Sequence, residues 1–304
     1  MCTTNTERRA QMQTKLNEHR RADGGDGESP NALPDHCLSL TVSGPWGHFR
    51  RVDGNTVKAT YRLPPRTTVA GLLAAIADYE RDGYYDVFDR DRSGIAIQPV
   101  GGRAAERGAG RESAIRTMNL PENSLTTSDD TKEGVPTLTK INSRGKVSIY
   151  YPNPRAPRQR TNYEVLVDPA YRLDVHLADE TAYERLHDRL ADGRSEYVPS
   201  LGLSEFLASV TFHGEFALTP ASDGDGEPVA VDSALPDPEG IVPVPERPHA
   251  TERSPGDMTR TSDGGFTGRK TTEFLRWAYS RDGDPLRTRT ANAYEVDSRT
   301  VVFS

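Results

Sequence analysis

Cysteine, lysine and long apolar runs are all scarce in this chain of 304 residues, and each scarcity excludes something. The two cysteines, Cys2 and Cys37, cannot make a disulfide framework or a cysteine-ligated zinc site. No apolar stretch approaches the roughly 18–20 residues that cross a bilayer. The first 34 residues are polar and carry no apolar segment typical of a secretory signal. We therefore expect a cytoplasmic protein that has no membrane partner.

Signatures of the common enzyme sites are missing as well. The seven histidines include no pair at the HxxxH or HExxH spacing of a helical zinc site. The chain also has no GxSxG nucleophile turn and no glycine-rich phosphate loop between a strand and a helix. We therefore expect no metal, no other cofactor and no small-molecule substrate.

The charges are unevenly distributed among residue types. Only six of the 38 basic residues are lysines, and 25 of the 45 acids are aspartates, giving a net charge of -7. The hydrophobic fraction is 34% and the mean hydropathy is -0.70. This composition resembles that of proteins from salt-accumulating halophilic archaea, where an acidic surface maintains solubility. The acidic average therefore does not exclude a nucleic-acid partner, and the local distribution of charge becomes the evidence.

The order of the expected elements predicts an α+β fold. Strands are expected at 37–42, 94–100, 163–167, 171–177 and 208–218, and helices at 67–82 and 179–192. This order is that of a ferredoxin-like or RRM-like βαββαβ domain spanning 35–218. A disordered leader, 1–34, precedes it. An acidic, proline-rich linker at 219–263 and a C-terminal segment at 264–304 that docks on the sheet follow it.

A basic insertion interrupts the predicted domain at 121–162. Within 131–160, seven basic residues stand against one acid, Glu133, which runs counter to the acidic background. The stretch Asn142 to Gly145 is typical of a hairpin tip, and Val147 to Tyr151 of its returning strand. The insertion is therefore either a solvated loop or a projecting hairpin that binds an anionic partner.

Aromatic and basic residues gather just beyond the first predicted strand. Gly44-Pro45 ends that strand, and Trp46, His48, Phe49, Arg50 and Arg51 follow at once. Rings of this kind stack on bases, and guanidinium groups hold phosphates. The plain alternative is that one or two of the rings close the edge of the core and that the arginines are solvated. His48, Tyr61 and Lys58 can also be combined into a metal-free ribonuclease site, although nothing in their spacing forces them together.

Four segments resemble the family-five CRISPR-associated proteins, in particular the type I-B branch of the RAMP superfamily. They are Gly44 to Arg50, Tyr61 to Leu73, Thr161 to Leu166 and Tyr197 to Ala208. The resemblance implies a subunit of the Cascade complex that holds the 5′ handle of crRNA and contacts the backbone and large subunits. It also implies that 121–162 is the family's thumb, which reaches toward the neighbouring backbone subunit. The related type I-C enzymes pair a tyrosine with adjacent Lys and His, and this chain has no Lys-His dipeptide.

We therefore predict a non-catalytic RNA-binding subunit that acts in antiviral defence. The alternatives are a metal-independent CRISPR-repeat endoribonuclease of the same superfamily and a protein-only scaffold subunit. No catalytic residue is predicted. The predicted RNA-binding residues are Trp46, His48, Phe49, Arg50, Arg51, Arg66, Lys140, Arg144, Lys146, Arg155, Arg158, Arg160 and Gly202.

Overall fold

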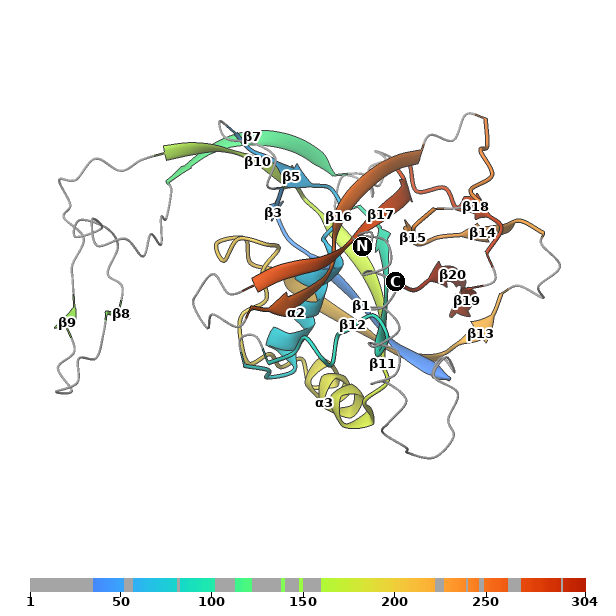
Figure 1. Ribbon diagram of the computed structural model, residues 1–304, viewed down its shortest axis with the longest axis horizontal. Helices are drawn as coiled ribbons and strands as arrows, with labels where there is room; N and C mark the ends of the chain where they lie inside the picture. Colours follow the sequence, from blue (N-terminus) through green and yellow to red (C-terminus); the bar gives the residue numbers. More distant parts are fainter. Residues whose placement is uncertain are drawn as a thin grey trace, which may run out of the picture. The chain divides into compact units, whose positions relative to one another are not determined.

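The described part of the computed structural model consists mostly of strands and contains two helices (Figure 1). The predicted leader lies outside the described residues. The structure describes residues 35–51, 57–80, 83–101, 113–121, 138–139, 148–149, 160–221, 227–238, 240–245, 249–261, 269–290 and 292–304.

The central element is a four-stranded antiparallel sheet. Its strands lie in the order β12-β1-β11-β6, close to the ranges predicted from alternation. Side chains alternate between the two faces, so Leu38, Leu40 and Val42 of β1 enter one hydrophobic core while Ser39 and Thr41 face the other way. The four strands are β1 (His36–Ser43), β6 (Ser93–Pro99), β11 (Ala170–Leu177) and β12 (Ser209–Ala217).

Two helices cover the apolar face of this sheet, and the protein is an α+β protein made mostly of strands (Figure 1). Helix α2 (Arg66–Ile76) ends earlier than predicted, because Asp78 takes a left-handed backbone conformation with φ 63°. Helix α3 (Glu180–Ala191) begins at Asp179, whose side chain accepts a hydrogen bond from the Ala182 amide. No helix in the described part of the chain is long and apolar enough to cross a membrane.

A second sheet carries the ends of the predicted insertion. Strands β7 (Ala114–Pro121) and β10 (Arg160–Val167) pair along eight residues, so the segment between them leaves and re-enters at Pro121 and Arg160. Within that segment, β8 (Leu138–Thr139) pairs with β9 (Ser148–Ile149), on either side of the predicted hairpin tip. The sheet is completed by β2 (Trp46–Gly47) and the parallel β4 (Val57–Lys58).

The predicted linker at 219–263 is wrong, because the described residues of this range form strands and contribute to the core. Val231, Ala234, Leu235 and Ser254 are buried. The strands of the range are β13 (Thr219–Pro220), β14 (Val229–Val231), β15 (Leu235–Pro236) and β16 (His249–Arg260). Further along the chain they pair with β17 (Arg269–Ser280), β18 (Leu286–Thr288) and β19 (Ala293–Val296), and β19 pairs with β20 (Arg299–Val302).

The proline and acid content of 219–263 predicted a linker wrongly, because prolines and acidic residues also occur in edge strands. Strand β16 is the outer strand of its sheet, and Pro255 lies where its register with β17 is interrupted, so no regular ladder bond is lost. One of the acids is structural: the Glu252 carboxylate accepts hydrogen bonds from the amides of Arg62 and Leu63 at 3.0–3.1 Å. Strand β16 thereby holds the chain just before α2.

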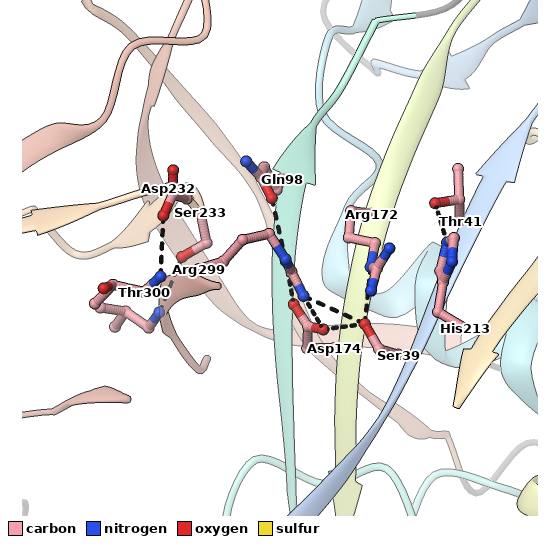
Figure 2. Close-up of polar contacts among 11 residues, drawn as sticks. Ser39, Thr41, Gln98, Arg172, Asp174, His213, Asp232, Ser233, Arg299 and Thr300 are labelled. Atoms are coloured by element: carbon pink, nitrogen blue, oxygen red, sulfur yellow. Dashed lines mark hydrogen bonds and ion pairs between the residues drawn. The ribbon is translucent and has the colours of Figure 1, made fainter. Parts of the chain in front are cut away.

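A buried ion pair joins β20 to the helix-free face of the main sheet (Figure 2). Arg299 donates two hydrogen bonds to Asp174, at 2.7 and 2.8 Å. The Asp174 side chain is 1% exposed and also accepts a hydrogen bond from the Ser39 hydroxyl. Because Asp174 would otherwise be an unpaired charge in the interior, the β19–β20 hairpin is needed to complete the sheet.

Replacing Arg299 by alanine is expected to lower the free energy of unfolding by about 3 kcal/mol, since it leaves Asp174 buried without its counter-ion. Urea denaturation measures the change. The matched control is R287A, which removes an exposed arginine from β18. Equal stability of the two variants would contradict a structural role for the pair.

His176 gives stability a pH dependence of predictable sign. Burial, and then the charge of Arg66, lowers the pKa of His176 to about 4. The unfolded chain therefore binds the proton more tightly, so stability falls as the pH drops below 6.5 toward 4. Between pH 7 and pH 4 the wild type should lose about 3 kcal/mol more than H176N, in which this titration is absent. Urea denaturation measures the loss of stability between pH 7 and pH 4. Equal losses in the wild type and H176N would show that His176 does not cause this pH dependence.

Candidate nucleic-acid interface

The candidate site is the loop that begins at Gly44, directly after β1. Strand β2 attaches the loop to β10 through the pairs Val167–Trp46 and Leu166–Gly47. The next two residues form β3 (Phe49–Arg50), which pairs with β5 (Thr60–Tyr61). The loop is therefore held at two successive points along its length.

Two of the predicted RNA-binding rings are buried, and their prediction as direct contacts is corrected. His48 is 1% exposed and Phe49 is 2% exposed. The His48 Nδ1 atom forms a 2.7 Å hydrogen bond with the carbonyl oxygen of Glu164, and Phe49 packs edge-on against Tyr171. A ring enclosed in this way cannot stack on a base, so both residues anchor the backbone of the loop.

Burial favours the uncharged form of His48. Its pKa is lowered chiefly by desolvation, against the raising effect of the hydrogen bond to Glu164. Its Nε2 atom is buried and has no hydrogen-bond partner among the described residues. Tyr61, another member of the ribonuclease site that was weighed from the sequence, is also buried.

Arg66 requires the same correction. Its side chain is 1% exposed, and the guanidinium donates hydrogen bonds to the carbonyl oxygens of Phe88, Ser93 and Ser304 at 2.7–3.1 Å. A further bond reaches the Ser93 hydroxyl. Burial lowers the pKa of Arg66 to about 10, so it remains charged at neutral pH. Arg66 links the start of α2 to the chain around it and does not face solvent.

Gly202 lies in another of the family-like segments, Tyr197 to Ala208, and this segment packs against the loop. The Leu201 carbonyl accepts a hydrogen bond from the His48 amide at 2.9 Å. At Gly202, φ is +93°, and a Cβ atom would lie 1.8 Å from the His48 carbonyl oxygen. Only glycine permits this approach, so the role of Gly202 is to let the segment 197–207 pack on the loop.

The other predicted residues of the loop differ in exposure. Arg50 and Arg51 are exposed, and Trp46 is half-buried. The buried neighbours His48 and Phe49 fix the backbone that carries the two arginines. Of the predicted basic residues in the insertion, only the backbone of Arg160 is described, as the first residue of β10. The others lie outside the described residues: Lys140, Arg144, Lys146, Arg155 and Arg158.

Sequence reasoning missed Glu164, which connects both attachment points of the loop. Its carbonyl oxygen accepts from His48, and its carboxylate accepts a 3.1 Å hydrogen bond from the Thr60 amide in β5. The only available signal was an acid within the family-like segment Thr161 to Leu166. Sequence reasoning also missed three exposed apolar residues: Tyr197, Val198 and Leu207.

Within the described part of the chain, no three His, Cys, Asp or Glu side chains gather as a metal site. The fold and the loop define a class: an α+β protein whose antiparallel sheet carries a braced, arginine-bearing loop at the end of its first strand. A family model described as CRISPR-associated protein (Cas_Cas5) matches residues 37–266. The chain belongs to this family, which confirms the resemblance at the level of the family.

The solved structures that match are distant in sequence. A CRISPR protein from Archaeoglobus fulgidus has 14% identity and a TM-score of 0.45, covering 88% of this chain and 98% of that one. A chain from a CRISPR RNA-guided surveillance complex has 15% identity and a TM-score of 0.41, covering 83% and 90%. No curated protein matches.

The close approach at Gly202 can be tested with a matched pair of glycines. Gly193 also has a positive φ, of 62°, but a Cβ atom there would meet nothing within 4 Å. G193A is expected to cost about 1 kcal/mol, from the backbone conformation alone. G202A should cost at least about 3 kcal/mol, because the segment that carries residue 202 must also move away from His48. Chemical denaturation that gives equal costs would contradict the proposed packing.

Proposed function

We propose that this protein is a non-catalytic RNA-binding subunit of a type I-B CRISPR Cascade complex. It holds the 5′ handle of crRNA and contacts the backbone and large subunits. Membership in the Cas5 family supports a role beside CRISPR RNA. The observation that carries the proposal is the loop at Gly44, where exposed arginines stand on a backbone fixed by buried neighbours.

Arg50 is the residue best suited to hold a phosphate. It is exposed, at the end of β3, and the described residues provide its side chain with no hydrogen bond or ion pair. Its backbone is fixed by pairing with Thr60, so little conformational freedom remains to be lost on binding. Trp46, half-buried at the start of the same loop, is the aromatic residue available there for stacking.

The arrangement of strands supports a ferredoxin-like domain with a thumb. The order β12-β1-β11-β6, with every neighbour antiparallel, is the one expected when two βαβ units interlock. The β7–β10 pair gives the basic insertion a firm base at Pro121 and Arg160. We infer that 121–162 is the thumb and that it reaches the backbone subunit.

The absence of catalysis is part of the proposal. A general base must reach the 2′-hydroxyl of its substrate. The burial of His48 and Tyr61 supports a structural role for both, in place of the acid–base role considered from the sequence. Incubating the purified protein with labelled repeat RNA in the absence of metal should leave the RNA intact, and specific cleavage would favour the endoribonuclease alternative.

Alanine substitution of Trp46 and Arg50 together is expected to weaken retention of crRNA in the purified complex by tenfold or more, because a stacked base and a charge-assisted contact are lost. The effect is measured as the amount of RNA per complex after washes at increasing KCl concentration. The washes include molar KCl, because the composition of the chain resembles that of halophilic proteins. R287A serves as the control for removal of an exposed arginine.

Unchanged RNA content in the double variant would overturn the role of the loop. If ultraviolet crosslinking found partner subunits but no RNA on this chain, the protein-only scaffold would replace the proposal. Crosslinks to the 5′ ends of repeat-derived RNAs within 44–66 would support it.

A further inference from the structure

A row of polar side chains crosses the helix-free face of the main sheet. In the strand register, Thr41 of β1 lies opposite Arg172 of β11 on one side and opposite Thr211 of β12 on the other. Directly opposed residues share a face, so Arg172 and Thr41 lie on the same side as Asp174 and Ser39. Figure 2 shows Arg172 between the Asp174–Arg299 ion pair and the Thr41–His213 pair.

A bulge in β12 adds a histidine to this row. The register between β1 and β12 shifts after Ser39, and Gly214 has a φ of +126°. The shift leaves His213 as the extra residue, and bulges of this kind redirect a side chain. A 2.8 Å hydrogen bond between His213 Nε2 and Thr41 Oγ1 fixes the ring beside Thr41 (Figure 2). His213 is exposed, whereas Thr41 and Arg172 are half-buried.

Arg172 carries a positive charge that its neighbours do not neutralise by contact. Its Nε atom donates a 2.8 Å hydrogen bond to the Ser39 hydroxyl. Its two terminal nitrogens have no partner in the described part of the chain, and the buried carboxylate beside it, Asp174, is already bound by Arg299. Partial burial, followed by the charges of Arg172 and Arg299, lowers the pKa of His213. The row therefore lies in a positive local field.

The chemistry of the row fits a phosphate better than a base. RRM sheets bind single strands through aromatic rings on this face. Here β1 and β11 place the half-buried Thr41 and Arg172 on that face, and the one ring that these two strands carry there, His176, is buried against Phe303. A planar guanidinium with two free nitrogens matches the geometry of phosphate oxygens. Thr41 precedes Gly44 by a length of extended chain of roughly 10 Å, so one RNA strand can reach both this row and the loop.

We propose that Arg172 and the Thr41–His213 pair form a subsite for a backbone phosphate of single-stranded RNA. The proposal rests on the proposed RNA-binding function and extends the interface from the loop onto the sheet. RNA bound at this subsite lies across β11, β1 and β12, next to the part of the sheet where Arg299 binds Asp174.

The test is the affinity of the full-length protein for a labelled CRISPR-repeat RNA, measured by fluorescence anisotropy over a range of KCl concentrations. R172A should bind about tenfold more weakly at low salt. Its salt slope should fall by about 0.7, the contribution of one phosphate on a single strand. The matched control is R185A, which removes an exposed arginine from α3, on the helix-covered side.

A second variant excludes misfolding as the cause. Asp297, in the turn between β19 and β20, acts electrostatically on Arg172 without an ion pair among the described residues. Its φ of 56° also suits asparagine. D297N should fold normally and bind RNA about twofold more tightly, a gain that unfolding cannot produce.

The possible results separate the two proposals. If the wild type binds RNA and both R172A and R185A bind it as tightly as the wild type, the subsite is overturned and the RNA-binding function stands. If the wild type binds no RNA under any salt condition, the proposed function itself is overturned. Weaker binding by R172A with tighter binding by D297N supports the subsite.

Discussion

The Asp174–Arg299 ion pair is the contact on which the helix-free half of the molecule depends. A carboxylate in the middle of a β-sheet is costly to bury, and the cost is offset only when its oxygens are fully bound. Arg299 and Ser39 together meet this requirement. The two charges are 125 residues apart, and the pair holds the β19–β20 hairpin on the main sheet together with the backbone bonds between Ile95 and Ser304. It also leaves Arg172, next along the strand, without a carboxylate of its own.

Charged side chains bind backbone groups elsewhere in the fold. The half-buried Glu164 and Glu252 accept hydrogen bonds from amides of the stretch 60–63, and the buried Arg66 donates to carbonyl groups around α2. Irregular segments have no ladder partners for these groups, and an unsatisfied buried amide or carbonyl is costly. Side chains that look like surface charges in the sequence thus hold irregular backbone in one conformation.

This use of charge explains which parts of the protein the sequence could predict. Alternation of apolar residues identified the four strands of the main sheet, because one face of each packs against the helices and its pattern records that packing. Strand β16 has no such pattern, since its stability comes from pairing with β17 and from Glu252. For the candidate site, the sequence located the loop from its residue types. It could not distinguish exposed Arg50 from buried Arg66, because that difference is made by residues distant in the chain.

The glycines complete the argument about the loop. Gly202 contributes no side chain to a ligand, yet it allows two chain segments to approach so closely that His48 and its neighbours have one position. Rigidity of this kind lowers the entropic cost of binding, because the exposed arginines are already placed before a ligand arrives. The loop also continues directly from the sheet, because β1, which ends at Ser43, carries Thr41. The candidate interface therefore continues β1, and its buried residues determine the positions of its exposed residues.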